Sequence, residues 1–169
     1  MVINTPPENA ILICCFTEGA GYRYIRQKCI HYNLLAGRAP DRERLTRIFW
    51  VERLPNFKPV ISNIVLSEIY DTPHEEKRIK MEQLVQGIEL LAFNKEADKL
   101  ATEYVKRGVI PEKYSADANH VAIAVTNGIR YLIIWNFKHI VRVNTRREIN
   151  LINALMEHEL IELLAPPEL

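Results

Sequence analysis

The sequence has no marked excess of charge and no long apolar run, and each of these absences excludes a class of protein. A formal net charge of +1 over 169 residues creates no global field that attracts polyanions, so a nucleic-acid partner needs a local basic patch. The apolar run 10–16 is far shorter than a membrane span, and residues 1–16 carry Glu8 and lack the basic start of a secretory signal. We therefore expect a cytoplasmic protein.

Cysteine is scarce and has no spacing that indicates a metal site. Cys14 and Cys15 are adjacent, so on a strand they point to opposite faces, and Cys29 is the third. We expect all three to be reduced, buried fillers. An apolar content of 48% with 25% charged residues is typical of a globular protein. The length suits one well-cored domain, so we predict a single domain over 1–169.

Short apolar stretches alternate with amphipathic ones along most of the chain, which predicts strands alternating with helices. The predicted strands are 58–62, 88–93, 131–134 and 160–164. The predicted helices are 41–50, 63–70, 74–86, 94–107, one that begins near 115, and 142–158. This alternation within one domain indicates the α/β class, with a mainly parallel sheet covered on both faces.

Residue types at the helix ends agree with these bounds. Ser62 or Asn63 is placed to cap the helix that follows the first of these strands, and Asn94 is placed to cap a later one. Gly87 and Gly108 are placed to end the helices that precede them. For the charged helix 74–86, the apolar residues expected on the buried face are Ile79, Leu84 and Val85.

The first strand has two candidates, because residues 1–35 form an atypical N-terminal segment. Residues 11–16 are short, apolar and bounded by Pro and Gly residues, as a buried strand would be. Residues 22–29 are the alternative, although Arg and Gln interrupt them. The pattern alone does not decide between the two.

Two acids follow predicted strands, and each has an ordinary structural explanation. Glu68 lies beside apolar residues on the helix that leaves strand 58–62, as a surface acid next to a buried stripe would. Asp117 is in the first turn of a helix, where an acid complements the helix dipole. However, sites in open α/β sheets lie outside the carboxyl ends of the strands, so the two carboxylates are also placed to converge on a divalent cation.

Several polar residues accompany these acids. His120 is three residues after Asp117 and shares its helix face, so it is either a satisfied, partly buried histidine or a general base. Asn136 is either a ligand through its amide oxygen or a turn residue. The densest basic cluster in the chain is either a solvated face or a phosphodiester-binding surface. It consists of Lys138, His139, Arg142, Arg146 and Arg147.

Three segments resemble, in order and spacing, the PIN-domain family. They are Val60-Ile-Ser-Asn-Ile-Val-Leu-Ser-Glu-Ile69, Ala116-Asp-Ala-Asn-His-Val-Ala-Ile-Ala124 and Ile134-Trp-Asn-Phe-Lys-His-Ile140. The most similar branch is related to the toxin half of VapBC toxin–antitoxin pairs. The resemblance covers roughly residues 40–169.

This resemblance implies a three-layer α/β/α fold with a central parallel sheet, and endonucleolytic RNA cleavage that depends on Mg2+ or Mn2+. By their positions in the family's motifs, Glu68 and Asp117 would be metal ligands and Asn136 a further catalytic position. Lys138, Arg142 and Arg146 would bind RNA, and Ser62 and His120 would border the site. The implied partners are RNA, an antitoxin protein and a second copy of the chain.

One acid of the family pattern is missing. The family opens with a strand that ends in an acid, and this acid is a principal metal ligand. Its position falls near Gln27 or Lys28 by spacing to the next helix, or near Leu12 if the strand is 11–16, where only Glu18 is close enough to substitute. Losing one carboxylate weakens metal binding. The alternative function is therefore a degenerate PIN domain that keeps a protein-binding surface without nuclease activity.

Overall fold

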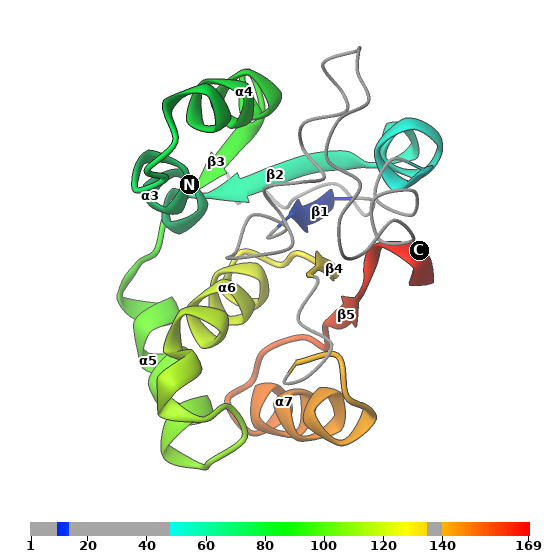
Figure 1. Ribbon diagram of the computed structural model, residues 1–169. Helices are drawn as coiled ribbons and strands as arrows, with labels where there is room; N and C mark the ends of the chain where they lie inside the picture. Colours follow the sequence, from blue (N-terminus) through cyan, green and yellow to red (C-terminus); the bar gives the residue numbers. More distant parts are fainter. Residues whose placement is uncertain (1–9, 14–47, 135–139) are drawn as a thin grey trace, which may run out of the picture.

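The computed structural model describes residues 10–13, 48–134 and 140–169, in which strands alternate with helices (Figure 1). The strands are β1 (Ala10–Ile13), β2 (Lys58–Ser62), β3 (Glu89–Leu91), β4 (Tyr131–Ile133) and β5 (Glu162–Leu164). The helices are α3 (Asn63–Tyr70), α4 (Glu75–Val85), α5 (Lys95–Lys106), α6 (Ser115–Thr126) and α7 (Val143–Leu155). Short helical turns are Phe49–Arg53, Leu54–Asn56, Glu112–Tyr114 and Pro166–Glu168.

The described strands pair in the order β3-β2-β1-β4-β5, and each of these pairs is parallel. Leu12 of β1 lies between Val60 of β2 and Leu132 of β4. β1 therefore overlaps the first candidate for the opening strand, 11–16, while the second candidate, 22–29, lies outside the described residues. The predicted α/β class, with parallel strands alternating with helices, is confirmed.

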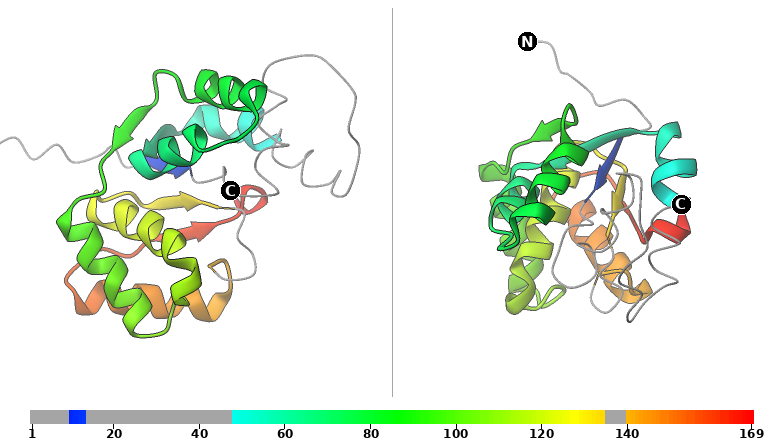
Figure 2. Two further views of the ribbon diagram at one scale, coloured as in Figure 1. Left: turned by 60° about the vertical axis from the view of Figure 1, so that its left-hand side comes forward. Right: turned by 45° about the horizontal axis from the view of Figure 1, so that its top comes forward.

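The direction in which successive strands are added to the sheet reverses between β1 and β4. From β1 the chain adds β2 and β3 on one side, and it then crosses over to add β4 and β5 on the other. Ligands of open parallel sheets bind outside the carboxyl ends of the strands at such a reversal. The helices follow this division, since α3 and α4 lie near β2 and β3, whereas α5, α6 and α7 gather near β4 and β5 (Figures 1 and 2).

Local sequence signals define the ends of the helices. The Ser62 hydroxyl accepts a hydrogen bond from the Val65 N–H at 3.3 Å, and so caps α3. The neighbouring Asn63 side chain instead accepts from the Phe93 N–H at 2.9 Å, which ties the start of α3 to the segment after β3. Asn94 caps α5 as predicted, through a 2.9 Å bond from the Ala97 N–H.

The buried face of α4 differs from the prediction. Ile79 is 43% exposed, whereas Met81 is 1% exposed and Val85 is also buried. Met81 and Val85 are four residues apart and share a face, and Ile79 lies about 200° from Met81 around the helix, given about 100° per residue. The prediction for Val85 is thus confirmed and that for Ile79 is wrong, because a helix with apolar residues on two sides buries the side that meets its neighbour.

The core is centred on α6 and β4. Val121, Ala122, Ile123 and Ala124 of α6 are fully buried, as is Leu132 of β4. A helix that is apolar on nearly all sides must be enclosed by other elements, and its small residues let α5 pack against it. None of the helices described here is long and apolar enough to span a bilayer.

Candidate functional site

Glu68 is held at the edge of the core by the helix that leaves β2. Val65 and Ile69 are both fully buried and lie one helical turn apart, so they fix the inner face of α3. Glu68 directly precedes Ile69 and lies beside this buried stripe. Its side chain is consequently only 24% exposed. The carboxylate is thus partly desolvated before any ligand is considered.

Asp117 and His120 belong to the first turns of α6. Both are buried, Asp117 at 6% exposure and His120 at 0%. The turn Glu112–Tyr114 leads directly into this helix. Because α6 connects to β4 within a parallel sheet, it runs back along the strands, and its first turns therefore lie toward their carboxyl ends. If residues of α3 and α6 converge at this rim as predicted, side chains of the two helices should contact each other.

That contact exists between Glu68 and His120, which we call the rim pair. His120 Nε2 lies 3.3 Å from Glu68 Oε1, although the two residues are 52 positions apart in the chain. An ionised carboxylate only accepts hydrogen bonds, so we assign the hydrogen to Nε2 from its partner. The imidazole then donates to the carboxylate. The expectation of a satisfied, partly buried histidine is therefore met only in part, because His120 is wholly buried and, among the described residues, only Nε2 has a partner.

The other two polar atoms of the rim pair lack partners. Glu68 Oε2 and His120 Nδ1 are buried and have no hydrogen-bond partner in the described part of the chain, where the only other such atom is Arg146 Nε. A buried acceptor without a donor costs about 1 to 3 kcal/mol, and more when it is charged. Native structures keep few such atoms, and those they keep mark strain, catalysis or a ligand. Two neighbouring open acceptors therefore indicate a site for a donor or a cation.

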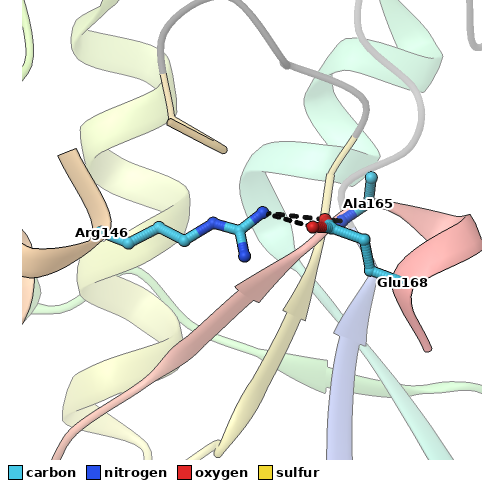
Figure 3. A network of polar contacts seen from close by, with 3 residues as sticks. All are labelled: Arg146, Ala165 and Glu168. Atoms are coloured by element: carbon cyan, nitrogen blue, oxygen red, sulfur yellow. Dashed lines mark hydrogen bonds and ion pairs between the residues drawn. The ribbon is translucent and has the colours of Figure 1, made fainter. Parts of the chain in front are cut away.

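Arg146 has a partner within the protein. Its guanidinium donates to both oxygens of Glu168 at 2.8 Å, and Glu168 Oε2 also accepts from the Ala165 N–H at 2.7 Å (Figure 3). The side chain thus fastens the segment after β5 to α7. In this arrangement its charge faces Glu168, and the RNA contact expected for Arg146 stays a prediction.

The remaining predicted site residues lie in different places. Arg142 is exposed at the N-terminal end of α7, where a phosphate can reach it. Ser62 is fully buried and its hydroxyl caps α3, so it has a structural role beside the site. Asn136 and Lys138 lie outside the described residues, as do Cys14, Cys15 and Cys29.

The described residues include donors of the kind that hard cations prefer. Glu68 Oε2 has no partner among the described residues, and a carboxylate oxygen is the kind of ligand that Mg2+ and Mn2+ prefer. Asp117 is buried on the helix that carries His120. No group of three or more His, Cys, Asp and Glu side chains within residues 10–13, 48–134 and 140–169 is arranged to hold a metal ion. The donor chemistry therefore fits a hard cation, and the number of described donors is below that of a complete site.

Sequence reasoning named both members of the rim pair and missed their contact. The signal was indirect, because His120 shares a helix face with Asp117, and nothing in a separation of 52 residues predicts a hydrogen bond to Glu68. It also missed that Glu168 binds Arg146, since an acid near the chain end has no local pattern. No protein-family model and no curated protein sequence matches the chain, so the side chains themselves are the guide to its chemistry.

Proposed function

We propose that the chain is a metal-dependent endoribonuclease of the PIN type, and the toxin component of a toxin–antitoxin pair. The observation that carries the proposal is the rim pair, in which one buried oxygen of Glu68 has no partner in the described part of the chain. Buried Asp117 lies one helical turn from His120 and brings a second carboxylate toward the same rim. Carboxylates that are largely removed from water are the groups that a hard divalent cation stabilises.

The strand arrangement supports the same proposal. A three-layer α/β/α fold with a central parallel sheet is what the family resemblance implies, and parallel pairing in the order β3-β2-β1-β4-β5 agrees with it. The order reverses next to β1 and β4, and α3 and α6 reach the carboxyl ends of the strands from different parts of the chain. A shared site at that rim explains why polar residues are buried there.

In this proposal the residues have distinct tasks. Glu68 and Asp117 bind Mg2+ or Mn2+, and Asn136 is a further ligand. The cation, when bound, supplies Lewis-acid activation for hydrolysis of a phosphodiester. Lys138 and Arg142 bind the RNA backbone. Because the net charge of the chain is only +1, RNA binding depends on such local basic residues. An antitoxin protein would hold such an enzyme inactive.

The test is cleavage of a mixed pool of labelled single-stranded RNA by the full chain, with Mn2+, with Mg2+ and with EDTA. We expect cleavage that requires metal, and a loss of about 100-fold or more in Asp117→Asn and in Glu68→Gln, since each removes a charged ligand. Glu162→Gln is the matched control. Glu162 is exposed at the amino end of β5, away from the rim, and its substitution should leave cleavage unchanged. Cleavage in EDTA, or full activity of Asp117→Asn, would contradict the proposal.

The second candidate is a degenerate domain that binds a protein partner without cleaving RNA. It is favoured by the absence of a three-residue metal-binding group among the described residues. It is also favoured by the sequence after β1, which ends at Ile13, since the next acid along the chain is Glu18. Calorimetric titration separates the two candidates: if millimolar Mn2+ gives no heat of binding to the wild type or to Asp117→Ala, the nuclease proposal fails.

A further inference from the structure

We infer that His120 is a positioning residue for Glu68: its Nε2–H holds Oε1 and thereby presents Oε2 to a divalent cation. This inference rests on the proposed metal-dependent function. It assigns His120 a specific task, because a residue that merely borders the site need not contact a ligand. The geometry behind it is the 3.3 Å contact together with the open, buried Oε2.

We call the hydrogen bond from His120 to Glu68 the tether. Its two partners differ in mobility, as expected if the rigid residue holds the flexible one in place. His120 is fully buried in α6, and the residue after it, Val121, and the one a turn later, Ala124, are also fully buried. The imidazole is therefore fixed by packing on all sides. Glu68 has three rotatable side-chain bonds and retains 24% exposure, so without a partner its carboxylate would turn into solvent. The hydrogen bond selects one orientation of a side chain that otherwise has several.

The open carboxylate oxygen is a better cation ligand than the open imidazole nitrogen. Both open atoms are buried, and Glu68 is the residue of the pair whose side chain retains exposed surface. Hard cations such as Mg2+ and Mn2+ also prefer oxygen to nitrogen. The opposite assignment is chemically distinct, because a histidine that binds metal commonly donates its other N–H to a carboxylate. In that case Nδ1 would be the ligand and Glu68 the supporting residue.

Mn2+ binding to the full chain distinguishes these assignments, measured by calorimetry and by the electron paramagnetic resonance signal of free Mn2+. His120→Gln keeps an amide N–H near the position of Nε2 and has no atom equivalent to Nδ1, whereas His120→Leu removes both. We expect His120→Leu to weaken Mn2+ binding about 10- to 100-fold, which is the usual cost of losing a supporting residue. His120→Gln should stay within about threefold of the wild type, because the tether is retained.

His158→Gln is the matched control. His158 follows α7, where its backbone N–H donates to the Asn153 carbonyl, and the hydrogen bonds described for His158 do not include one to the rim pair. The same substitution there should leave Mn2+ affinity unchanged. Thermal unfolding of each variant in EDTA verifies that it is folded.

Each of the other possible results contradicts either the tether or the proposed function. Wild-type affinity in His120→Leu overturns the tether alone and leaves the proposed function standing. Loss in His120→Gln equal to that in His120→Leu overturns it in favour of ligation through Nδ1. A wild type that binds no Mn2+ overturns the proposed function and the tether together.

A measurement without metal keeps the inference testable if His120→Leu does not fold. Long-range 1H–15N correlation on the wild-type chain in EDTA reports which ring nitrogen of His120 carries the proton. We expect a protonated Nε2 whose proton shift changes in Glu68→Ala, where the acceptor is gone. A ring protonated only at Nδ1, or a signal indifferent to Glu68→Ala, overturns the tether.

Discussion

The rim pair can be compared with a second buried polar cluster, which connects α5, α7 and the start of β5. In this second cluster, the α5–α7 network, the Tyr104 hydroxyl donates to Asn153 Oδ1, and Asn153 Nδ2 donates to Asn150 Oδ1 at 3.3 Å. Asn150 also accepts from the Ile161 N–H at 2.9 Å and donates to the Ile161 carbonyl at 3.0 Å. Every side-chain polar atom of these three residues is paired.

The two clusters differ in whether their polar atoms are all paired within the described part of the chain. The α5–α7 network satisfies its own hydrogen bonds and leaves nothing for a ligand, which is how a buried polar cluster specifies a single packing arrangement. Within residues 10–13, 48–134 and 140–169, the rim pair leaves two acceptors open. Since open buried acceptors destabilise a fold, a donor or cation from outside the described residues is their expected partner. The following substitutions test this contrast, from the largest expected effect to the smallest.

Asn153→Leu should cost the most stability, about 3 kcal/mol, because it removes two hydrogen bonds and leaves the Tyr104 hydroxyl buried without a partner. Urea unfolding in EDTA measures the change. Asn144→Leu, at an exposed position of the same helix, is the control and should shift the unfolding free energy by less than about 0.5 kcal/mol. Equal effects at the two positions would show that the network contributes no specific stability.

Tyr104→Phe should cost about 1 to 2 kcal/mol near neutral pH, because it leaves Asn153 Oδ1 without its donor. Burial raises the pKa of Tyr104 well above its usual value, and the hydrogen bond to Asn153 opposes this rise only partly. In the unfolded chain the phenol ionises near pH 10, while in the folded chain it stays protonated. The stability that Tyr104 contributes is therefore constant below that pH and declines above it.

This pH dependence provides its own control. Wild type and Tyr104→Phe should differ by a constant amount from pH 6 to pH 9, and the difference should shrink as pH rises beyond about 10. Unfolding free energies across this range test it. If the difference in unfolding free energy between the two proteins instead grew at high pH, the assignment of the buried hydroxyl as a donor would be contradicted.

Glu68→Gln should behave oppositely to the network variants. Without metal it should leave stability unchanged or raise it by about 0.5 to 1 kcal/mol, since a neutral amide is less costly to bury than a carboxylate with an open oxygen. Thermal unfolding in EDTA and in Mn2+ measures this. The wild type should gain stability from Mn2+ and the variant should not. Marked destabilisation of Glu68→Gln in EDTA would instead make the rim pair a structural contact.

Arg146→Lys should have the smallest effect, about 0.5 kcal/mol, because the ion pair with Glu168 is partly exposed and solvent screens it. Lysine keeps the charge and loses the planar guanidinium, whose Nη2 donates to both carboxylate oxygens. Its effect should fall further in 1 M salt. Arg147→Lys at the next, exposed position is the control and should have no measurable effect.

The predictable parts of the fold are those with a local cause. The bounds of α3 follow from an apolar stripe and from a Ser62 cap three residues before its bonded N–H, and the cap of α5 at Asn94 has the same origin. The two errors or ambiguities have non-local causes. Which side of α4 is buried depends on its neighbours, and the identity of the first strand depends on pairing with β2 and β4.

In the candidate site, the individual residues are predictable from the sequence and their contacts are not. Glu68, Asp117 and His120 are recognisable in the sequence because each lies at a helix position near a strand signal. Their relation to one another is not recognisable, because 52 residues separate Glu68 from His120 and the strand order decides which helices meet. The sequence also contains no sign that one carboxylate oxygen is bonded and the other open.

The sequence by itself determined the alternation of strands and helices and the caps that begin α3 and α5, since these depend on residues within one or two turns of each other. Only the tertiary structure decided that β1 lies between β2 and β4, that Arg146 binds Glu168 and that His120 binds Glu68. Such contacts form when packing brings distant segments together, and their energy depends on burial and on orientation, which a linear pattern does not encode.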